Sequence, residues 1–212
     1  MEEEKKVSPA KQKLIANYEQ QRQRYLQDGY WEYNEVISVL KANVMALITA
    51  GPFAVIGIII WIFAKKEEIF SRYLNQTVLF LVVFAACIFI HEMLHGAGWF
   101  LWTTEKWKSI YVGMMWKSLT PYCHCKEPLR PKQYLFGVLM PFLVLGVGVY
   151  VAAFISGSYM LLFLSLLNIL VAGGDITIAW MELKYLKYKE NCYILDHPTE
   201  CGFIVFMKEN QI

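Results

Sequence analysis

The sequence is poor in charged side chains, and none of its long apolar stretches contains a lysine or an arginine. Of the 212 residues, 18% are charged and 57% are hydrophobic, whereas soluble domains carry roughly a quarter charged residues. The apolar excess is gathered into runs, which indicates a lipid bilayer and not an oversized soluble core. The net charge of +2 comes without the basic stripe that nucleic-acid binding needs, so we expect no nucleic-acid partner.

Cysteine is also too scarce and too irregular to form a disulfide framework. The chain has 5 cysteines, an odd number. Cys123 and Cys125 are separated by one residue, a shorter spacer than structural zinc sites use. We favour free cytosolic thiols. A cluster of Cys123 and Cys125 with Cys192 or Cys201 stays open as the alternative.

Four apolar segments have the length that a helix needs to cross about 30 Å of hydrocarbon. Tryptophans lie near their ends, as expected for side chains at the membrane–water interface. The four predicted spans are Asn43–Ala64, Thr77–Trp102, Gln133–Ile155 and Tyr159–Met181.

The basic residues are distributed unevenly between the segments that connect these spans. Most lie in the N-terminal 42 residues, in the 103–132 loop and after residue 181, whereas the 65–76 loop has few and the 156–158 turn has none. Because positive charge is enriched on the cytoplasmic side, the pattern predicts an integral membrane protein with both termini and the long loop in the cytosol.

We therefore predict an all-α membrane protein with about four transmembrane helices. Residues 1–42 are expected to form a cytosolic or interfacial leader with an amphipathic helix, which lies either on the membrane surface or against the protein's own cytosolic face. Residues 43–181 form the four-helix core, and residues 182–212 form a cytosolic tail. The middle loop is β-prone from Ser109 to Trp116 and bends at Pro121, which predicts a short β-hairpin.

The second span carries the sequence His91-Glu92-Met93-Leu94-His95. Two histidines four residues apart project from one face of a helix and can bind a single zinc ion. Glu92 is then placed to act as the general base on the attacking water. Ionisable residues inside a membrane helix are costly and usually functional, so the motif predicts a catalytic zinc centre.

A catalytic zinc ion normally takes three protein ligands. Asp175 is the only carboxylate in the other three spans, and counting residues from the cytosolic ends brings it level with His95. We predict that Asp175 is the third ligand; a buried aspartate that pairs with a lysine or hydrogen-bonds to a helix is the alternative. Asn168 lies two turns earlier and is either a donor to the developing oxyanion or an interhelical polar contact.

Several motifs together resemble a bacterial family named putative zincin peptidases. They are His91-Glu92-Met93-Leu94-His95-Gly96, the 120–128 loop, Asn168 to Asp175, and Asp196 to Phe203. More distantly the layout resembles site-2 proteases. The resemblance implies zinc bound by His91, His95 and Asp175, with Glu92 as base, in a bacterial cell membrane. It departs from the site-2 pattern in the fourth span, where the glycines precede Asp175 and no proline intervenes.

We therefore predict a zinc-dependent membrane peptidase that cleaves a membrane or membrane-proximal protein near the cytosolic face. The alternative is a metal-binding membrane protein without protease activity: a zinc transporter, a scaffold or a pseudoprotease. His124 and His197 are interpreted as solvated or turn-stabilising histidines, although the Asp196-His197-Pro198 turn could gate the site from the cytosol.

Overall fold

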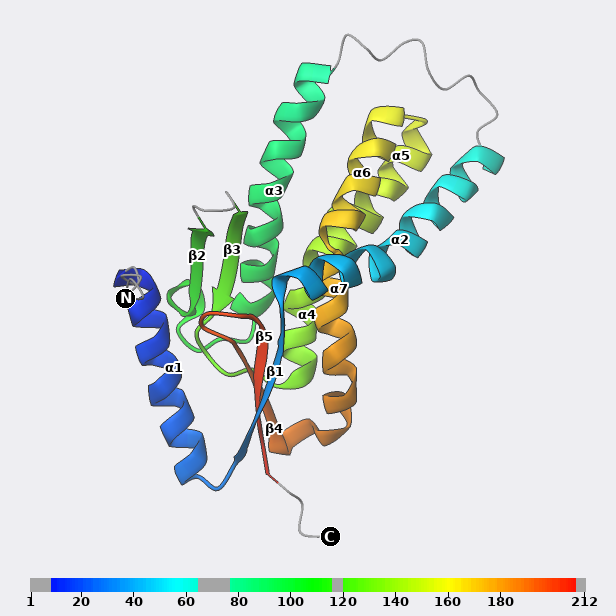
Figure 1. Ribbon diagram of the computed structural model, residues 1–212. Helices are drawn as coiled ribbons and strands as arrows, with labels where there is room; N and C mark the ends of the chain where they lie inside the picture. The colour runs from blue at the N-terminus through cyan, green and yellow to red at the C-terminus, as the bar shows by residue number, and fades with distance from the viewer. Residues whose placement is uncertain (1–8, 65–76, 116–119, 209–212) are drawn as a thin grey trace, which may run out of the picture.

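The computed structural model describes residues 9–64, 77–115 and 120–208. Long helices extend to one end of the molecule, and two small sheets lie near the other end (Figure 1). In chain order the elements are α1 (Pro9–Gln27), β1 (Trp31–Ile37), α2 (Val39–Ala64), α3 (Thr77–Phe100), the short 3-10 helix η2 (Lys106–Ser109), β2 (Ile110–Met115), β3 (Thr120–Cys125), α4 (Pro131–Pro141), the π-helical turn η3 (Phe142–Gly148), α5 (Val149–Ser156), α6 (Tyr159–Val171), α7 (Gly173–Glu182), the 3-10 helix η4 (Leu183–Asn191), β4 (Cys192–Asp196) and β5 (Cys201–Met207).

Within the described residues, three helical stretches are long and apolar enough to cross a membrane: Val44–Ala64, Thr77–Phe100 and Pro131–Ser156. A fourth crossing is formed if Tyr159–Val171 and Gly173–Tyr188, which meet at a bend of 45°, count as one span. These stretches coincide with the four predicted segments. The third is continuous through Pro141 because a π-helical turn follows it, a local adjustment that accommodates the missing backbone N–H of proline.

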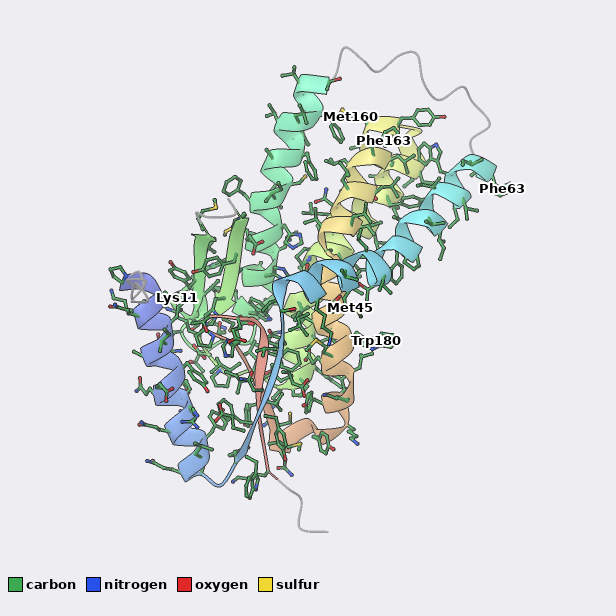
Figure 2. All side chains as sticks on the ribbon, viewed as in Figure 1. Lys11, Met45, Phe63, Met160, Phe163 and Trp180 are labelled. Carbon is green, nitrogen blue, oxygen red and sulfur yellow. The ribbon has the colours of Figure 1, made fainter. Side chains whose placement is uncertain are left out.

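The helical stretches present apolar side chains outward. Phe63 is 80% exposed and Trp180 is 69% exposed, and both point away from the neighbouring helices (Figure 2). Exposed apolar surface of this extent is unfavourable in water and suits contact with lipid.

The predicted hairpin in the middle loop is present. Strands β2 and β3 pair antiparallel from Ile110 opposite Cys125 to Met115 opposite Thr120. The base of the hairpin packs on the motif helix α3: a Cβ atom added at Gly96 would come within 2.9 Å of Ile110 and 3.5 Å of Cys123.

A second, three-stranded sheet joins the two ends of the chain, with strand order β1-β5-β4. Strand β1 pairs antiparallel with β5 from Trp31 opposite Met207 to Ile37 opposite Cys201. The prediction of a helix-rich leader was therefore wrong for residues 31–37, which extend because β5 supplies their hydrogen-bonding partner. The β-prone run after the Asp196-His197-Pro198 turn is β5.

Helix α1 covers one face of this sheet, and parts of α4, α7 and η4 cover the other (Figure 1). Tyr18 and Tyr25 of α1 pack with Leu195, Ile204 and Phe206, so the leader helix lies against the protein itself. On the opposite face, the buried residues of the sheet join Tyr134, Ala179 and Tyr185 in one apolar core. This small layer of sheet and helix is therefore packed directly onto the helices that carry the predicted site.

Candidate metal centre

The two histidines of the motif lie one turn apart on α3, and both are buried. Asp175, in the first turn of α7, faces them from the neighbouring helix. Its Oδ2 lies 3.0 Å from Nε2 of His91, and its Oδ1 lies 3.3 Å from Nε2 of His95. One ligand atom from each of the three residues lies within 4.8 Å of the other two. The structure thus brings together the three residues predicted as metal ligands.

Close packing between helix backbones sets the position of these side chains. A Cβ atom at Gly98 would lie 2.6 Å from Cα of Gly137, so α3 and α4 touch through two glycines. On the other side of the site, a Cβ atom at Gly173 would lie 2.5 Å from the carbonyl oxygen of Ala46, so α7 rests directly on α2. The bend of 45° between α6 and α7 then places Asp175 in the first turn of a new helix.

The residues at this site fit a zinc ion. Nδ1 of His95 lies 2.9 Å from the carbonyl oxygen of Gly137; because a carbonyl only accepts, Nδ1 carries the proton and Nε2 keeps its lone pair for a metal. Oδ2 of Asp175 is buried without a hydrogen-bond partner in the described part of the chain, although Nε2 of His91 is close. A set of two imidazoles and one carboxylate that converge on one point is typical of catalytic zinc.

Glu92 adjoins this ligand set without belonging to it. Its side chain is partly buried, and its carboxylate faces the backbone N–H of Cys123 in β3. The general-base candidate is therefore held between the motif helix and the hairpin. A carboxylate next to a metal-bound water can remove the water's proton as it attacks a carbonyl carbon.

A family profile described as "Putative zincin peptidase" matches residues 84–193. The chain belongs to this family. The matched range runs from the middle of α3 to β4 and includes the motif, the hairpin and Asp175. No curated protein and no solved structure matches the chain.

Within this zincin peptidase framework, Asn168 stands apart from the ligand cluster. It is buried in α6, and its side-chain amide donates to the carbonyl of Leu164 at 2.8 Å. Its side chain also lies beside the thiol of Cys87 on α3. In this conformation Asn168 links two helices, and its part in oxyanion binding stays a prediction.

In the part of the chain that the structure describes, the remaining cysteines and histidines do not assemble a second metal site. Across residues 9–64, 77–115 and 120–208, His91, His95 and Asp175 are the one group with ligand-like geometry. Cys123, Cys125, Cys192 and Cys201 are free thiols. Burial, followed by the nearby carboxylates of Asp196 and Glu92, raises the pKa of the Cys123 thiol.

The two histidines outside the motif differ from each other. Nδ1 of His197 accepts the backbone N–H groups of Thr199 and Glu200 at 3.3 and 2.9 Å, so this histidine stabilises a turn, as predicted. His124 is 5% exposed and lies 4.0 Å from Asp196. The expectation of a solvated residue was wrong for His124, whose pKa is lowered by its burial.

The sequence did not point to the residues that support His95 from behind. The ring of His95 stacks on Trp99, and Trp99 stacks on Tyr134 of α4, with 5.5 Å between ring centroids in each pair. The indole N–H of Trp99 donates to the backbone carbonyl of Tyr134 at 3.0 Å. Trp99 lies one turn after His95, but its pairing with Tyr134 depends on how α3 crosses α4, which leaves no mark in the sequence of either helix.

Proposed function

We propose that this protein is an integral-membrane zinc peptidase that hydrolyses peptide bonds near the cytosolic face of the membrane. One observation carries the proposal: Asp175 of α7 converges with His91 and His95, which lie with Glu92 on the apolar helix α3. Membership of the zincin peptidase family supports it. The cytosolic placement of both termini rests on the distribution of lysine and arginine, and the bacterial cell membrane rests on the family resemblance.

In this mechanism His91, His95 and Asp175 hold the zinc ion. Zinc, when bound, supplies Lewis acidity toward the water and the scissile carbonyl. Glu92 accepts a proton from the water as the oxygen of the water bonds to the carbonyl carbon. The same carboxyl group then gives the proton to the amide nitrogen as the C–N bond breaks, which leaves a carboxylic acid and an amine. Asn168 is proposed to donate to the oxyanion, for which its amide must turn away from Leu164.

The hairpin is proposed to hold an extended segment of the substrate. In β3, Pro121 has no N–H, the N–H of Cys125 is bonded to Asp196, and the N–H of Cys123 faces Glu92. The edge of β3 that faces away from β2 therefore offers carbonyl oxygens as acceptors. A substrate strand that pairs there would donate its own amides to these carbonyls.

The decisive experiment replaces Glu92. Glu92→Gln keeps the size of the side chain and removes its basicity, so the purified variant should retain zinc and lose hydrolysis of a membrane-anchored reporter peptide. General-base catalysis contributes about 10²–10⁴-fold, and turnover should fall within that range. Glu19→Gln, which neutralises a carboxylate paired with Arg22 on the leader helix, is the matched control.

Two outcomes separate the alternatives. Unchanged turnover in Glu92→Gln, or zinc binding without hydrolysis in the unaltered protein, would favour a transporter or scaffold. Absence of zinc from purified protein that is supplied with the metal would favour a pseudoprotease.

A further inference from the structure

The outer edge of β3 carries two carboxylates on successive backbone amides. At the base of the hairpin the N–H of Lys126 donates to the carbonyl of Ser109. Since N–H groups alternate between the two edges of an antiparallel strand, Cys125 and Cys123 direct their N–H groups away from β2. The N–H of Cys125 donates to Oδ2 of Asp196 at 2.6 Å, and the N–H of Cys123 reaches Glu92.

Asp196 ties this edge to the helices behind the metal site. It ends β4 and is 9% exposed. Its Oδ1 accepts the hydroxyl of Tyr134 in α4, while its Oδ2 takes the amide of Cys125. Tyr134 is the residue whose ring stacks on Trp99, which in turn stacks on His95. One carboxylate thus connects the hairpin to the α3–α4 pair that holds a zinc ligand.

A displacement at Cys125 must reach Cys123, because the two are neighbours on one edge of a short strand. They are about 7 Å apart along β3, and each has an anchor that the other lacks. If the bond to Asp196 is lost, β3 is free to shift at Cys125, and the amide of Cys123 moves relative to Glu92. Catalytic groups tolerate little of this, since a misplacement of about 1 Å can lower turnover by about 100-fold.

We propose that Asp196 is a positioning residue for hydrolysis: by holding β3 against Tyr134, it sets the backbone amide of Cys123 against Glu92. The inference rests on the proposed role of Glu92 as general base. The partners of Asp196 are the amide of Cys125, the hydroxyl of Tyr134 and the ring of His124, not the three predicted metal ligands, so it acts through the strand.

The same apolar core contains a second tyrosine–carboxylate bond, which serves as a matched control. The hydroxyl of Tyr185 donates to Glu35 of β1. Tyr134 and Tyr185 both pack against Phe203, at 5.8 and 6.2 Å between ring centroids. Glu35 also pairs with Lys184 at 2.7 Å and lies in β1, which has no strand pairing with the hairpin. Loss of either tyrosine hydroxyl removes the same kind of bond from the same core. Only the bond of Tyr134 is connected, through Asp196 and β3, to Glu92.

The test compares Tyr134→Phe with Tyr185→Phe in the full-length purified protein, by kcat, KM and zinc content on a membrane-anchored reporter peptide. Tyr134→Phe should lower kcat by about 10–100-fold with KM and zinc unchanged, whereas Tyr185→Phe should stay within about two-fold of the unaltered protein. Asp196→Ala should behave as Tyr134→Phe does. Asp196→Asn keeps an acceptor for Cys125 and an N–H to donate to the Tyr134 hydroxyl oxygen, and it should recover most of the lost kcat.

Equal kcat values for Tyr134→Phe and Tyr185→Phe would overturn the inference, as would a loss of zinc from Tyr134→Phe. If Asp196→Ala does not accumulate, the two tyrosine variants carry the test, since each removes one hydroxyl. Glu92→Gln, measured in parallel, separates the two proposals. Full activity of Glu92→Gln refutes the peptidase mechanism itself, whereas an inactive Glu92→Gln beside two equal tyrosine variants refutes the positioning role alone.

Discussion

Replacement of Asp175 tests whether the third zinc ligand comes from α7, the helix that follows the 45° bend after α6. Asp175 approaches both histidines, with oxygen–nitrogen distances of 3.0 and 3.3 Å, and it alone of the three ligand candidates is on α7. Asp175→Ala leaves two imidazoles from one helical turn, which hold one edge of a tetrahedral ion. Asp175→Asn keeps the shape but offers a neutral amide, a poorer ligand, so it should do nearly as much harm.

The expected magnitude follows from the number of ligands. Structural zinc sites with four ligands have apparent binding free energies of about 10–16 kcal/mol, so one ligand carries about 3 kcal/mol, a factor of about 150 in Kd. With zinc at about 1,000 times the Kd of the unaltered protein, binding stabilises its fold by about 4.1 kcal/mol, and the fold of Asp175→Ala by about 1.2 kcal/mol. For a chain of this size the zinc-induced rise in Tm should shrink from about 8–16 °C to about 2–5 °C.

The assay measures Tm in detergent with chelator and with added zinc, together with the zinc content of the purified protein. Thr177→Val is the matched control, because Thr177 is buried on the same helix and bonds to the carbonyl of Gly173 and to Thr49. That variant disturbs the packing of α7 against α2 but keeps every ligand. It should lower Tm with and without zinc by the same amount.

Full zinc occupancy and an undiminished zinc-induced rise in Tm in Asp175→Ala would refute the assignment. The ligand would then have to lie elsewhere, and His197 and Glu127 would be the next candidates. In the structure the carboxylate of Glu127 is occupied by Ser109, Thr104 and the backbone N–H of Glu105. Burial by itself raises the pKa of Glu127, but these hydrogen bonds together outweigh it and hold the pKa below its usual value.

Three further predictions follow from single features. Burial lowers the pKa of His197, so its neutral form contributes stability above the unfolded pKa near 6.5, and this stability is lost as pH falls through the folded pKa. The Tm of the unaltered protein should therefore fall more steeply from pH 7 to pH 5 than the Tm of His197→Asn, whose side chain accepts the same amides without titrating. Parallel curves of Tm against pH would contradict this. Asn168→Ala should lower kcat by about 10²–10³-fold with KM unchanged if the amide binds the oxyanion, and an unaltered kcat would leave it an interhelical contact. Single cysteines at Ser8 and Gln211, which lie outside the described residues, should be labelled in intact cells only by reagents that cross the membrane, and labelling from outside would reverse the topology.

Local sequence was sufficient wherever a property is carried by a continuous stretch. The apolar segments were predicted as Thr77–Trp102 and Gln133–Ile155, and the helices run from Thr77 to Phe100 and from Pro131 to Ser156. Spacing along one helix gave the pair His91 and His95. Counting residues to a common depth was enough to select Asp175, because lipid leaves few places for a carboxylate.

The strand Trp31–Ile37 shows where such reasoning fails. Its sequence, Trp-Glu-Tyr-Asn-Glu-Val-Ile, alternates apolar and polar residues over only its first four positions, and it comes directly after a helix-rich segment. It becomes a strand because Cys201–Met207, at the opposite end of the chain, pairs with it along its whole length. The sequence around residues 31–37 does not show that residues 201–207 will pair with it, and strand formation depends on that pairing.

The same distinction applies to the centre itself. By itself the sequence determined which side chains are candidates for metal ligation and for the general base, because helix periodicity places His91, Glu92 and His95 without help from the rest of the chain. Only the tertiary structure decided that Gly137 orients His95, that β3 contacts Glu92, and that Asp196 joins β3 to Tyr134. These contacts arise where separate elements cross, and the angle and depth of each crossing depend on packing throughout the fold.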